Sequence, residues 1–410
     1  MSNISYGAFL RENARWLAAG ALLSFLSSFG QTFFIAIFSG EIRETFGLSH
    51  GQWGGIYTLG TALSAAIMFF TGGLADKFRI RTIAVVVIAS LAAACFAMAL
   101  NPSVVLLPLI ILALRYFGQG MSHHAAYVAM ARWFVATRGR ALAVATIGFS
   151  LSEATMPLFF VWLKTFFSWQ ALWIGAGVFC LLMLPVFAIL LRTERTPESI
   201  ARESTSYGMD GRFWTRSQAL RHPVFWAMVP ALLFFPAFGT AFWFHQVHFA
   251  EVKGWDHLSL VAVFPLGTGA FALSTIAYGW AIDRFGSARL LPLYLLPLVL
   301  AFTAHWYAPS LAWSAVGVVL MGVAGGGQAT LPAACWAEFF GTRFIGSIKA
   351  AVAAVMVLGS AIGPGLTGWL IDVGFAFPTQ LLFFAGSFAL ASAVLVVPIR
   401  NAQKRLAVSS

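Results

Sequence analysis

Long apolar runs alternate with short polar segments along almost the whole chain. Each run is about 20 residues long, which is the length that an α-helix needs to cross a bilayer. Six runs precede a polar central stretch and six follow it, at 16–39, 51–73, 82–100, 104–134, 140–163 and 169–191, then at 223–249, 258–282, 288–307, 310–339, 345–370 and 376–398. The pattern predicts an all-α membrane protein with twelve transmembrane helices.

The polar central stretch divides the chain into two halves with equal numbers of runs. We therefore expect an N-terminal six-helix bundle at 1–191, a cytoplasmic linker at 192–222 and a C-terminal six-helix bundle at 223–410. The linker is rich in charged residues, so we expect it to lie at the surface.

Composition excludes a soluble protein. Of the 410 residues, 60% are hydrophobic and 10% are charged, whereas soluble domains carry roughly a quarter charged residues. The net charge of +11 would suggest nucleic-acid binding in a soluble protein. Here the basic residues lie between apolar runs, so they indicate membrane topology and no nucleic-acid partner.

The distribution of basic residues predicts the orientation in the membrane. With a cytoplasmic N-terminus, only Arg43, Lys164 and Lys253 fall on the opposite face, while Arg115 and Lys349 lie inside apolar runs. Every other Lys and Arg falls on the cytoplasmic side. This asymmetry predicts a multi-pass protein of the cell inner (plasma) membrane with both termini in the cytoplasm.

The two halves repeat each other. The segment 72–78 (GGLADKF) matches 279–285 (GWAIDRF) at a spacing of about half the chain, and the same spacing relates Pro157 to Pro364. A similar spacing relates 30–34 (GQTFF) to 239–243 (GTAFW). The repeats predict that the two bundles are pseudo-symmetric copies of one six-helix unit.

These motifs resemble those of the major facilitator superfamily. The loop at 72–77 is similar to that superfamily's signature between the second and third spans, and 115–120 (RYFGQG) is similar to its intramembrane arginine followed by glycines. Within the superfamily, 131–141 resembles the monocarboxylate and oxalate/formate branch. The resemblance implies a secondary transporter, not an enzyme, that works by alternating access around a site at the interface of the repeats.

The repeated loop supplies candidates for a cytoplasmic gate. An aspartate at a helix end accepts hydrogen bonds from exposed N–H groups and pairs with a nearby arginine. We expect Asp76 to pair with Arg132 or Arg138, and Asp283 to pair with Arg343. Alternatively, both aspartates are solvated loop charges.

Arg115 is the strongest single signal for a functional site. An arginine near the middle of a transmembrane helix costs about 3 kcal/mol on insertion scales, so it needs a partner. Gln119 and His123 follow on nearby faces of the same helix, and Glu153 lies at a similar depth in the fifth span, which predicts an Arg115–Glu153 ion pair. Either Glu153 exchanges a proton while Arg115 alternates between it and an anionic substrate, or the pair is a permanent structural bridge.

The resemblance implies that the first and seventh spans line the substrate cavity. Gln31 and Thr240 occupy matching positions there, Trp243 lies one turn from Thr240, and Gln328 is a further polar candidate in the tenth span. His245 either relays protons and binds substrate or belongs to the cavity wall. His245 and His248 have a spacing that metal ligands use, but no third ligand accompanies them, so we expect no metal and no cofactor.

Together these features predict a proton-coupled or exchanging transporter of a small organic anion of monocarboxylate type. We expect its partners to be the small-molecule substrate, protons and the lipid bilayer, and we expect a monomer. The alternative is a proton-coupled exporter of drugs or other hydrophobic compounds, which would suit the aromatic content of 15%.

Overall fold

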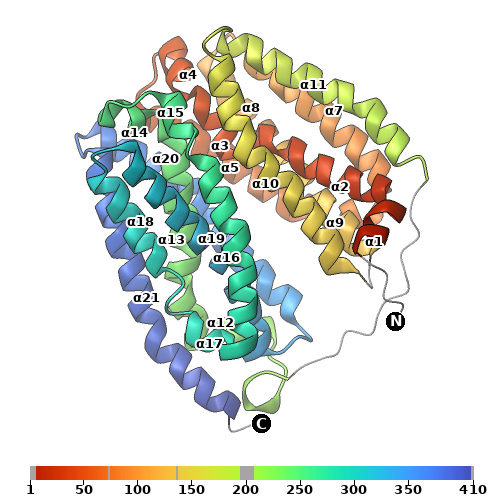
Figure 1. The fold of residues 1–410 in the computed structure, drawn as a ribbon, viewed down its shortest axis with the longest axis vertical. Helices are drawn as coiled ribbons and strands as arrows, with labels where there is room; N and C mark the ends of the chain where they lie inside the picture. Colours follow the sequence, from red (N-terminus) through yellow and green to blue (C-terminus); the bar gives the residue numbers. More distant parts are fainter. Residues whose placement is uncertain (1–5, 73, 135–136, 194–206, 408–410) are drawn as a thin grey trace. The chain divides into compact units, whose positions relative to one another are not determined.

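The computed structural model describes residues 6–72, 74–134, 137–193 and 207–407 (Figure 1). The side chains of Tyr6, Asp76, Lys77, Arg138 and Ala407 are not among those described. The chain divides into two compact units, unit 1 at Met1–Arg202 and unit 2 at Glu203–Ser410. Every regular element in the described ranges is a helix.

Unit 1 contains the first six predicted spans. The first span consists of α2 followed by four short helices, η1, α3, η2 and α4. The fourth span consists of η3, which is a single 3₁₀ turn, followed by α8, η4 and α9. In chain order the elements are α1 Tyr6–Glu12, α2 Ala14–Leu26, η1 Ser27–Gly30, α3 Thr32–Ile35, η2 Ala36–Phe38, α4 Ser39–Phe46, α5 His50–Thr71, α6 Leu74–Lys77, α7 Ile80–Ala99, η3 Val104–Leu106, α8 Leu107–Leu114, η4 Arg115–Ser122, α9 His123–Trp133, α10 Arg138–Leu163 and α11 Trp169–Leu190.

Unit 2 contains the other six spans and begins with the last part of the predicted linker. Its long helices are more continuous than those of unit 1. In chain order the elements are η5 Met209–Gly211, α12 Arg216–Leu220, α13 Pro223–Phe244, α14 Gln246–Lys253, α15 His257–Val261, α16 Phe264–Phe285, α17 Ser287–Leu290, α18 Leu296–Tyr307, α19 Leu311–Phe340, α20 Ile345–Asp372 and α21 Phe377–Ala407.

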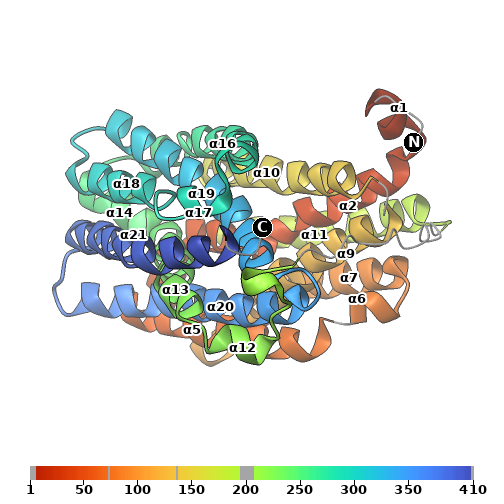
Figure 2. The same cartoon turned by 90° about the horizontal axis from the view of Figure 1, so that it is seen from below.

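Both units pair their spans in the same way. In unit 1 the first span packs on the fifth (α2 on α10), the second on the fourth (α5 on α8 and η4) and the third on the sixth (α7 on α11). In unit 2 α13 packs on α20, α16 on α19 and α18 on α21. Figures 1 and 2 show α7 beside α11 along their whole lengths. The shared pairing is what a duplicated six-helix unit produces.

The predicted fold class is confirmed. Ten of the described helices are long and apolar enough to cross a membrane, and the bent pair Ala14–Gly30 and Thr32–Phe46 raises the number to eleven. The ninth predicted span, 288–307, differs because it is interrupted between α17 and α18. Pro292 and Pro297 lack the N–H group that an unbroken helix needs there, which accounts for the interruption.

The expected surface linker at 192–222 requires a correction in its second half. From residue 207 onward the segment packs on unit 2, where Met209 is fully buried and Trp214 is 5% exposed. Burial of these two apolar side chains stabilises the fold, and the charged groups around them keep their hydration because they stay at the surface.

Candidate substrate site

The first span breaks in its middle, at Gly30 and Gln31. Gln31 is extended (φ −84°, ψ 152°) and the helical segments on either side of it bend by 47°. The N–H groups of Phe34 and Ile35 bond to the carbonyl of Gln31. The break therefore leaves the Gly30 carbonyl without a helical donor and available to another partner.

The fourth span crosses the first at this break. A β-carbon on Gly30 would lie 2.0 Å from the carbonyl oxygen of Leu114, and one on Gly118 would lie 2.6 Å from the Cα of Gly30. Only two glycines allow backbones to approach so closely. The crossing segment of the fourth span, η4, is a π-helix, a form that is common at functional sites.

Arg115 begins this π-helix and occupies the crossing. Its side chain is 1% exposed. Nη1 donates to the Gly30 carbonyl at 3.0 Å and to the hydroxyl of Thr32 at 3.3 Å. The guanidinium lies 5.4 Å from the ring centroid of Tyr57, whose hydroxyl is 2.6 Å from that of Thr32. Nε is buried and has no hydrogen-bond partner among the described atoms.

The expected Arg115–Glu153 ion pair is wrong for this structure. Among the described side chains, no Asp or Glu forms an ion pair with Arg115. Glu153 follows Ser152, whose hydroxyl bonds to that of Ser28, so the next side chain along α10 points about 100° away from this contact. Arg115 instead uses the carbonyl that the helix break exposes, which periodicity along an ideal helix does not predict.

The other candidates in unit 1 lie near this crossing. Gln31 is the residue at which the first span breaks, and Gln119 is half-buried on the same π-helix as Arg115. The His123 ring packs against Tyr127 and Phe149 at centroid distances of 4.5 and 5.2 Å, and its Nδ1 has no partner among the described atoms. The structure thus places Arg115, Gln31 and Gln119 on the two backbone segments that cross here.

The substrate-site candidates in unit 2 include no carboxylate and no guanidinium. His245 is buried, with Nε2 2.9 Å from the Thr367 hydroxyl of α20, so it joins two helices. Trp243 packs edge-on against Phe264 at 4.7 Å. Thr240 lies half-buried one turn earlier on α13.

Gln328 has a partner that the sequence analysis missed. Its side-chain oxygen accepts a hydrogen bond of 3.0 Å from the hydroxyl of Tyr294, in the interrupted segment between α17 and α18. Thr32 and Tyr57 were missed as well. The hydroxyl groups of Tyr294, Thr32 and Tyr57 lie inside apolar runs that contain several other Ser and Thr residues, so the sequence alone does not single them out.

The gate candidates are only partly brought together. Nη1 of Arg132 donates to the carbonyl of Ala75 at 2.8 Å, next to Asp76. The side chains of Asp76 and Arg138 lie outside the described part of the chain. Asp283 is exposed.

The expected Asp283–Arg343 pair is wrong for this structure, because the two residues form no ion pair within the described part of the chain. The Arg343 guanidinium instead lies over the rings of Phe213 and Phe344, 5.7 and 5.4 Å from their centroids. The ring of Phe213 belongs to the segment that packs on unit 2 before α13, which was expected to be a surface linker.

Comparisons with known proteins agree with this geometry. Residues 20–353 match the family model described as Major Facilitator Superfamily. The fold is similar to the crystal structure of a bacterial homologue of the human lysosomal transporter Spinster, inward-facing and unoccupied (TM-score 0.65, 16% identity, 96% of this chain and 95% of that one). It is also similar to that of the nucleoside transporter NupG (TM-score 0.68, 12% identity, 94% and 98%).

One curated relative matches over a shorter stretch. It is a multidrug resistance protein B homologue of Mycobacterium tuberculosis (strain CDC 1551 / Oshkosh), 33% identical over 133 residues. The match covers 31% of this chain and 24% of the relative, so it spans about a quarter of the relative's length.

Proposed function

Because this chain belongs to the major facilitator superfamily and is a membrane transporter rather than an enzyme, we propose that it carries a small organic anion of monocarboxylate type. Transport proceeds by alternating access and is coupled to protons or to exchange. The protein lies in the inner membrane with both termini in the cytoplasm.

The main support for this proposal is that the groups that hold the buried Arg115 guanidinium carry no negative charge. A guanidinium buried in a transmembrane helix is costly, and it is held here by a carbonyl, a hydroxyl and an aromatic ring, all of them neutral. These groups orient the cation without cancelling its charge. An anionic substrate supplies the missing charge, and the unpartnered Nε offers it a hydrogen bond.

Glu153 is the candidate for proton coupling. It is half-buried within α10 and is free of ion pairs to the described side chains. A carboxyl group in a membrane span is usually a functional site. With Arg115 engaged elsewhere, Glu153 is available to take up and release a proton during the cycle.

The remaining polar candidates are proposed as neutral contacts of the substrate. Neutral groups and aromatic rings orient a ligand and supply contact area without competing for its charge. They are Gln31, Gln119, His123, Thr240, Trp243, His245 and Gln328.

We place the cytoplasmic gate of unit 1 at the loop that contains Asp76. The hydrogen bond from Arg132 to the carbonyl of Ala75 supports this proposal, since it fixes an arginine beside the aspartate. In unit 2, Asp283 is exposed, and its position in the repeated motif is what supports a gate role for it.

Uptake into proteoliposomes tests the proposal. Proteoliposomes with the purified protein should accumulate a labelled short carboxylate such as lactate or oxalate. An external pH lower than the internal pH should accelerate this uptake. The corresponding amides, which have the same shape and no charge, should not compete. Absence of transport for every carboxylate, with transport of a neutral or cationic compound, would overturn the proposal.

Glu153→Gln separates coupling from binding. The variant should lose uptake driven by a pH gradient but retain exchange of internal for external substrate, because the amide cannot carry the proton. Glu251→Gln, at an exposed position in unit 2, is the matched control. Unchanged proton dependence in Glu153→Gln would remove Glu153 from the coupling mechanism.

A second function, export of hydrophobic compounds, is favoured by a different feature of unit 1. A cavity of about 630 Å³ lies between α2, α10 and α11, and phenylalanines from all three helices line it. Thr155 is the one hydroxyl side chain among its described lining residues. A cavity of this size and character suits an apolar ligand.

Efflux of a fluorescent lipophilic cation such as rhodamine 6G tests this second function. Gly175→Leu should block efflux, because Gly175 lines the cavity and has open space around its missing side chain. Gly386→Leu places the same side chain in open space in unit 2 and is the control. Equal efflux by both variants would exclude this cavity as the export site.

A further inference from the structure

The segment 208–222, which we call the clasp, is a folded element fixed to unit 2. The N–H of Gly208 bonds to the carbonyl of Arg212 at 3.0 Å, and a β-carbon on Gly208 would lie 2.4 Å from the carbonyl oxygen of Phe339. The N–H of Trp214 bonds to the carbonyl of Phe340 at 3.1 Å. These contacts attach the clasp to the end of α19.

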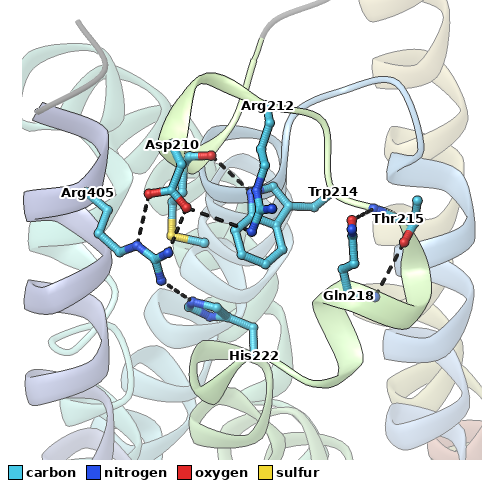
Figure 3. A network of polar contacts seen from close by, with 8 residues as sticks. Asp210, Arg212, Trp214, Thr215, Gln218, His222 and Arg405 are labelled. Carbon is cyan, nitrogen blue, oxygen red and sulfur yellow. Dashed lines mark hydrogen bonds and ion pairs between the residues drawn. The ribbon is translucent and has the colours of Figure 1, made fainter.

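Asp210 attaches the clasp to the end of α21. Its carboxylate receives hydrogen bonds from Arg405, with Nε to Oδ1 at 3.0 Å and Nη2 to Oδ2 at 2.7 Å (Figure 3). Asp210 adopts a left-handed backbone (φ 58°, ψ 24°), and among the described residues other than glycine it alone has a positive φ. Aspartate tolerates this conformation, which aims its side chain at Arg405.

His222 adds a further contact, because each of its two ring nitrogens faces one hydrogen-bond donor. Its Nε2 lies 3.1 Å from Nη1 of Arg405, and its Nδ1 accepts from the N–H of Val224 at 3.3 Å, which caps the start of α13. Both partners are donors. A neutral imidazole has one acceptor nitrogen, so it satisfies one of them at a time, and a protonated imidazole satisfies neither.

Two elements bring charges close to His222, α21 and the clasp, while α19 contacts it with the uncharged ring of Phe340. Arg405 on α21 and Arg212 in the clasp oppose its protonation, whereas Asp210 favours it. Burial, together with the two arginines, lowers the pKa of His222 below its ordinary value of 6.5. The closed clasp therefore contains a neutral histidine at neutral pH.

We propose that the clasp is a pH-sensitive device that holds the start of α13 and the ends of α19 and α21 together while His222 is neutral, and that releases α21 when His222 takes up a proton. The basic residues assign this end of unit 2 to the cytoplasmic side. α13 also carries Thr240 and Trp243, so release of its first turn changes the support of a candidate substrate helix. The proposal goes beyond the proposed function and does not depend on the substrate.

The direction of the pH effect follows from the lowered pKa. The folded clasp binds the His222 proton less tightly than the unfolded chain does. Its stabilising effect is therefore complete above pH 6.5 and is lost as the pH falls from there through the lowered pKa.

A distance measurement between the clasp and α21 tests the proposal. Spin labels on Ser217→Cys and Asn401→Cys, both at exposed positions, report this distance by double electron–electron resonance on the purified full-length protein. The native cysteines are buried and should stay unlabelled. We expect one narrow distance at about pH 7.5 and an added longer population at about pH 5.5, on the two sides of the ordinary histidine pKa of 6.5.

Two substitutions separate the functions of the two ring nitrogens. His222→Gln supplies an acceptor for Arg405, and His222→Asn supplies a cap for Val224, but neither titrates. Both should lose the pH response, and His222→Gln should stay closed at both pH values. Arg405→Gln should show the longer population at both values, and His257→Gln, at the start of α15, should behave as the parent protein.

Either of two results would overturn the proposal. One is a parent protein with the same distance at both pH values, and the other is a pH response that persists in His222→Gln. The midpoint of thermal unfolding, measured for each labelled protein, identifies any variant that fails to fold. In that case the pH response of His222→Asn decides the question.

Discussion

The matched positions Gly30 in unit 1 and Gly239 in unit 2 show how far the two halves have diverged. The first span breaks at Gly30, and a β-carbon there would lie 2.0 Å from the backbone of the fourth span. The seventh span, α13, runs unbroken through Gly239, and a β-carbon there would meet nothing within 4 Å. The same repeat thus contains a tight polar crossing in one copy and an ordinary helix in the other.

The two units therefore share the packing of their spans but differ in the polar side chains that the spans carry. Unit 1 contains a buried arginine and a carboxyl group within its spans, Arg115 and Glu153. The substrate-site candidates of unit 2 carry no carboxylate or guanidinium: the Tyr294 hydroxyl bonds to Gln328, and His245 bonds to the Thr367 hydroxyl. We infer that unit 1 provides the charge of the transport cycle and that unit 2 provides shape and neutral hydrogen bonds.

The largest expected effect comes from alanine at the two matched glycines. Gly30→Ala should destabilise the protein by about 3 kcal/mol, the upper end of the usual cost of overpacking, since backbone rather than a flexible side chain opposes the new methyl group. Gly239→Ala should be neutral or stabilising by up to about 1 kcal/mol, since alanine is the better helix former. Thermal unfolding and yield of folded protein in detergent measure both. Equal effects would remove the structural contrast between the units.

Removal of a hydroxyl group from either unit should have the next largest effect, on the apparent KM. Thr32→Val removes an acceptor of Arg115, so the apparent KM for an anionic substrate should rise about tenfold, as for the loss of a hydrogen bond to a charged group. Tyr294→Phe removes a neutral bond to Gln328, and its KM should rise no more than about fivefold. Uptake kinetics in proteoliposomes measure both. A larger effect for Tyr294→Phe would reverse the assignment of roles to the two units.

The smallest effect concerns two lysines near the ends of spans. Lys164 forms an ion pair with Glu41, whereas Lys253 donates to the carbonyls of Trp306 and Ala308 at 2.8 and 3.3 Å. Lys253→Gln should change the free energy of unfolding by less than about 0.5 kcal/mol, and Lys164→Gln by up to about 1 kcal/mol.

The pH dependence gives a further check on Lys253. Burial lowers its pKa, so the unfolded chain holds this proton more tightly, and its contribution to stability should rise as the pH approaches 10.5 from below. Unfolding midpoints of the parent protein and Lys253→Gln, compared near pH 8 and near pH 10 on either side of this titration, measure it. A difference that shrinks with pH would contradict the assignment.

The sequence was sufficient to predict the helical membrane fold, because run length and charge asymmetry reflect the bilayer itself. It also identified Arg115 as a candidate site residue, because a charge within a transmembrane helix is costly. The partners of Arg115 were not predictable, because the break at Gln31 and the π-helix change which groups face the guanidinium. Both features lie at the close contact of Gly30 with Gly118, a contact between two spans that the periodicity of a single span does not reveal.

Two further differences have the same origin in tertiary contact. The ninth span was predicted as continuous, but its interrupted segment places Tyr294 where it reaches Gln328. The linker was predicted to lie at the surface because it is charged, but Met209 and Trp214 within it find an apolar surface on unit 2. Composition averaged over a segment does not reveal two such anchors.

Ligand-induced thermal stabilisation shows whether Arg115 binds an anionic substrate. Purified protein is screened with carboxylates, sugars, amino acids and lipophilic cations, in parallel with Arg115→Gln and with Lys349→Gln, an exposed control. We expect a carboxylate to raise the unfolding midpoint of the parent protein and of Lys349→Gln but not of Arg115→Gln. Stabilisation by a sugar or a lipophilic cation that persists in Arg115→Gln, with no response to any carboxylate, would contradict it.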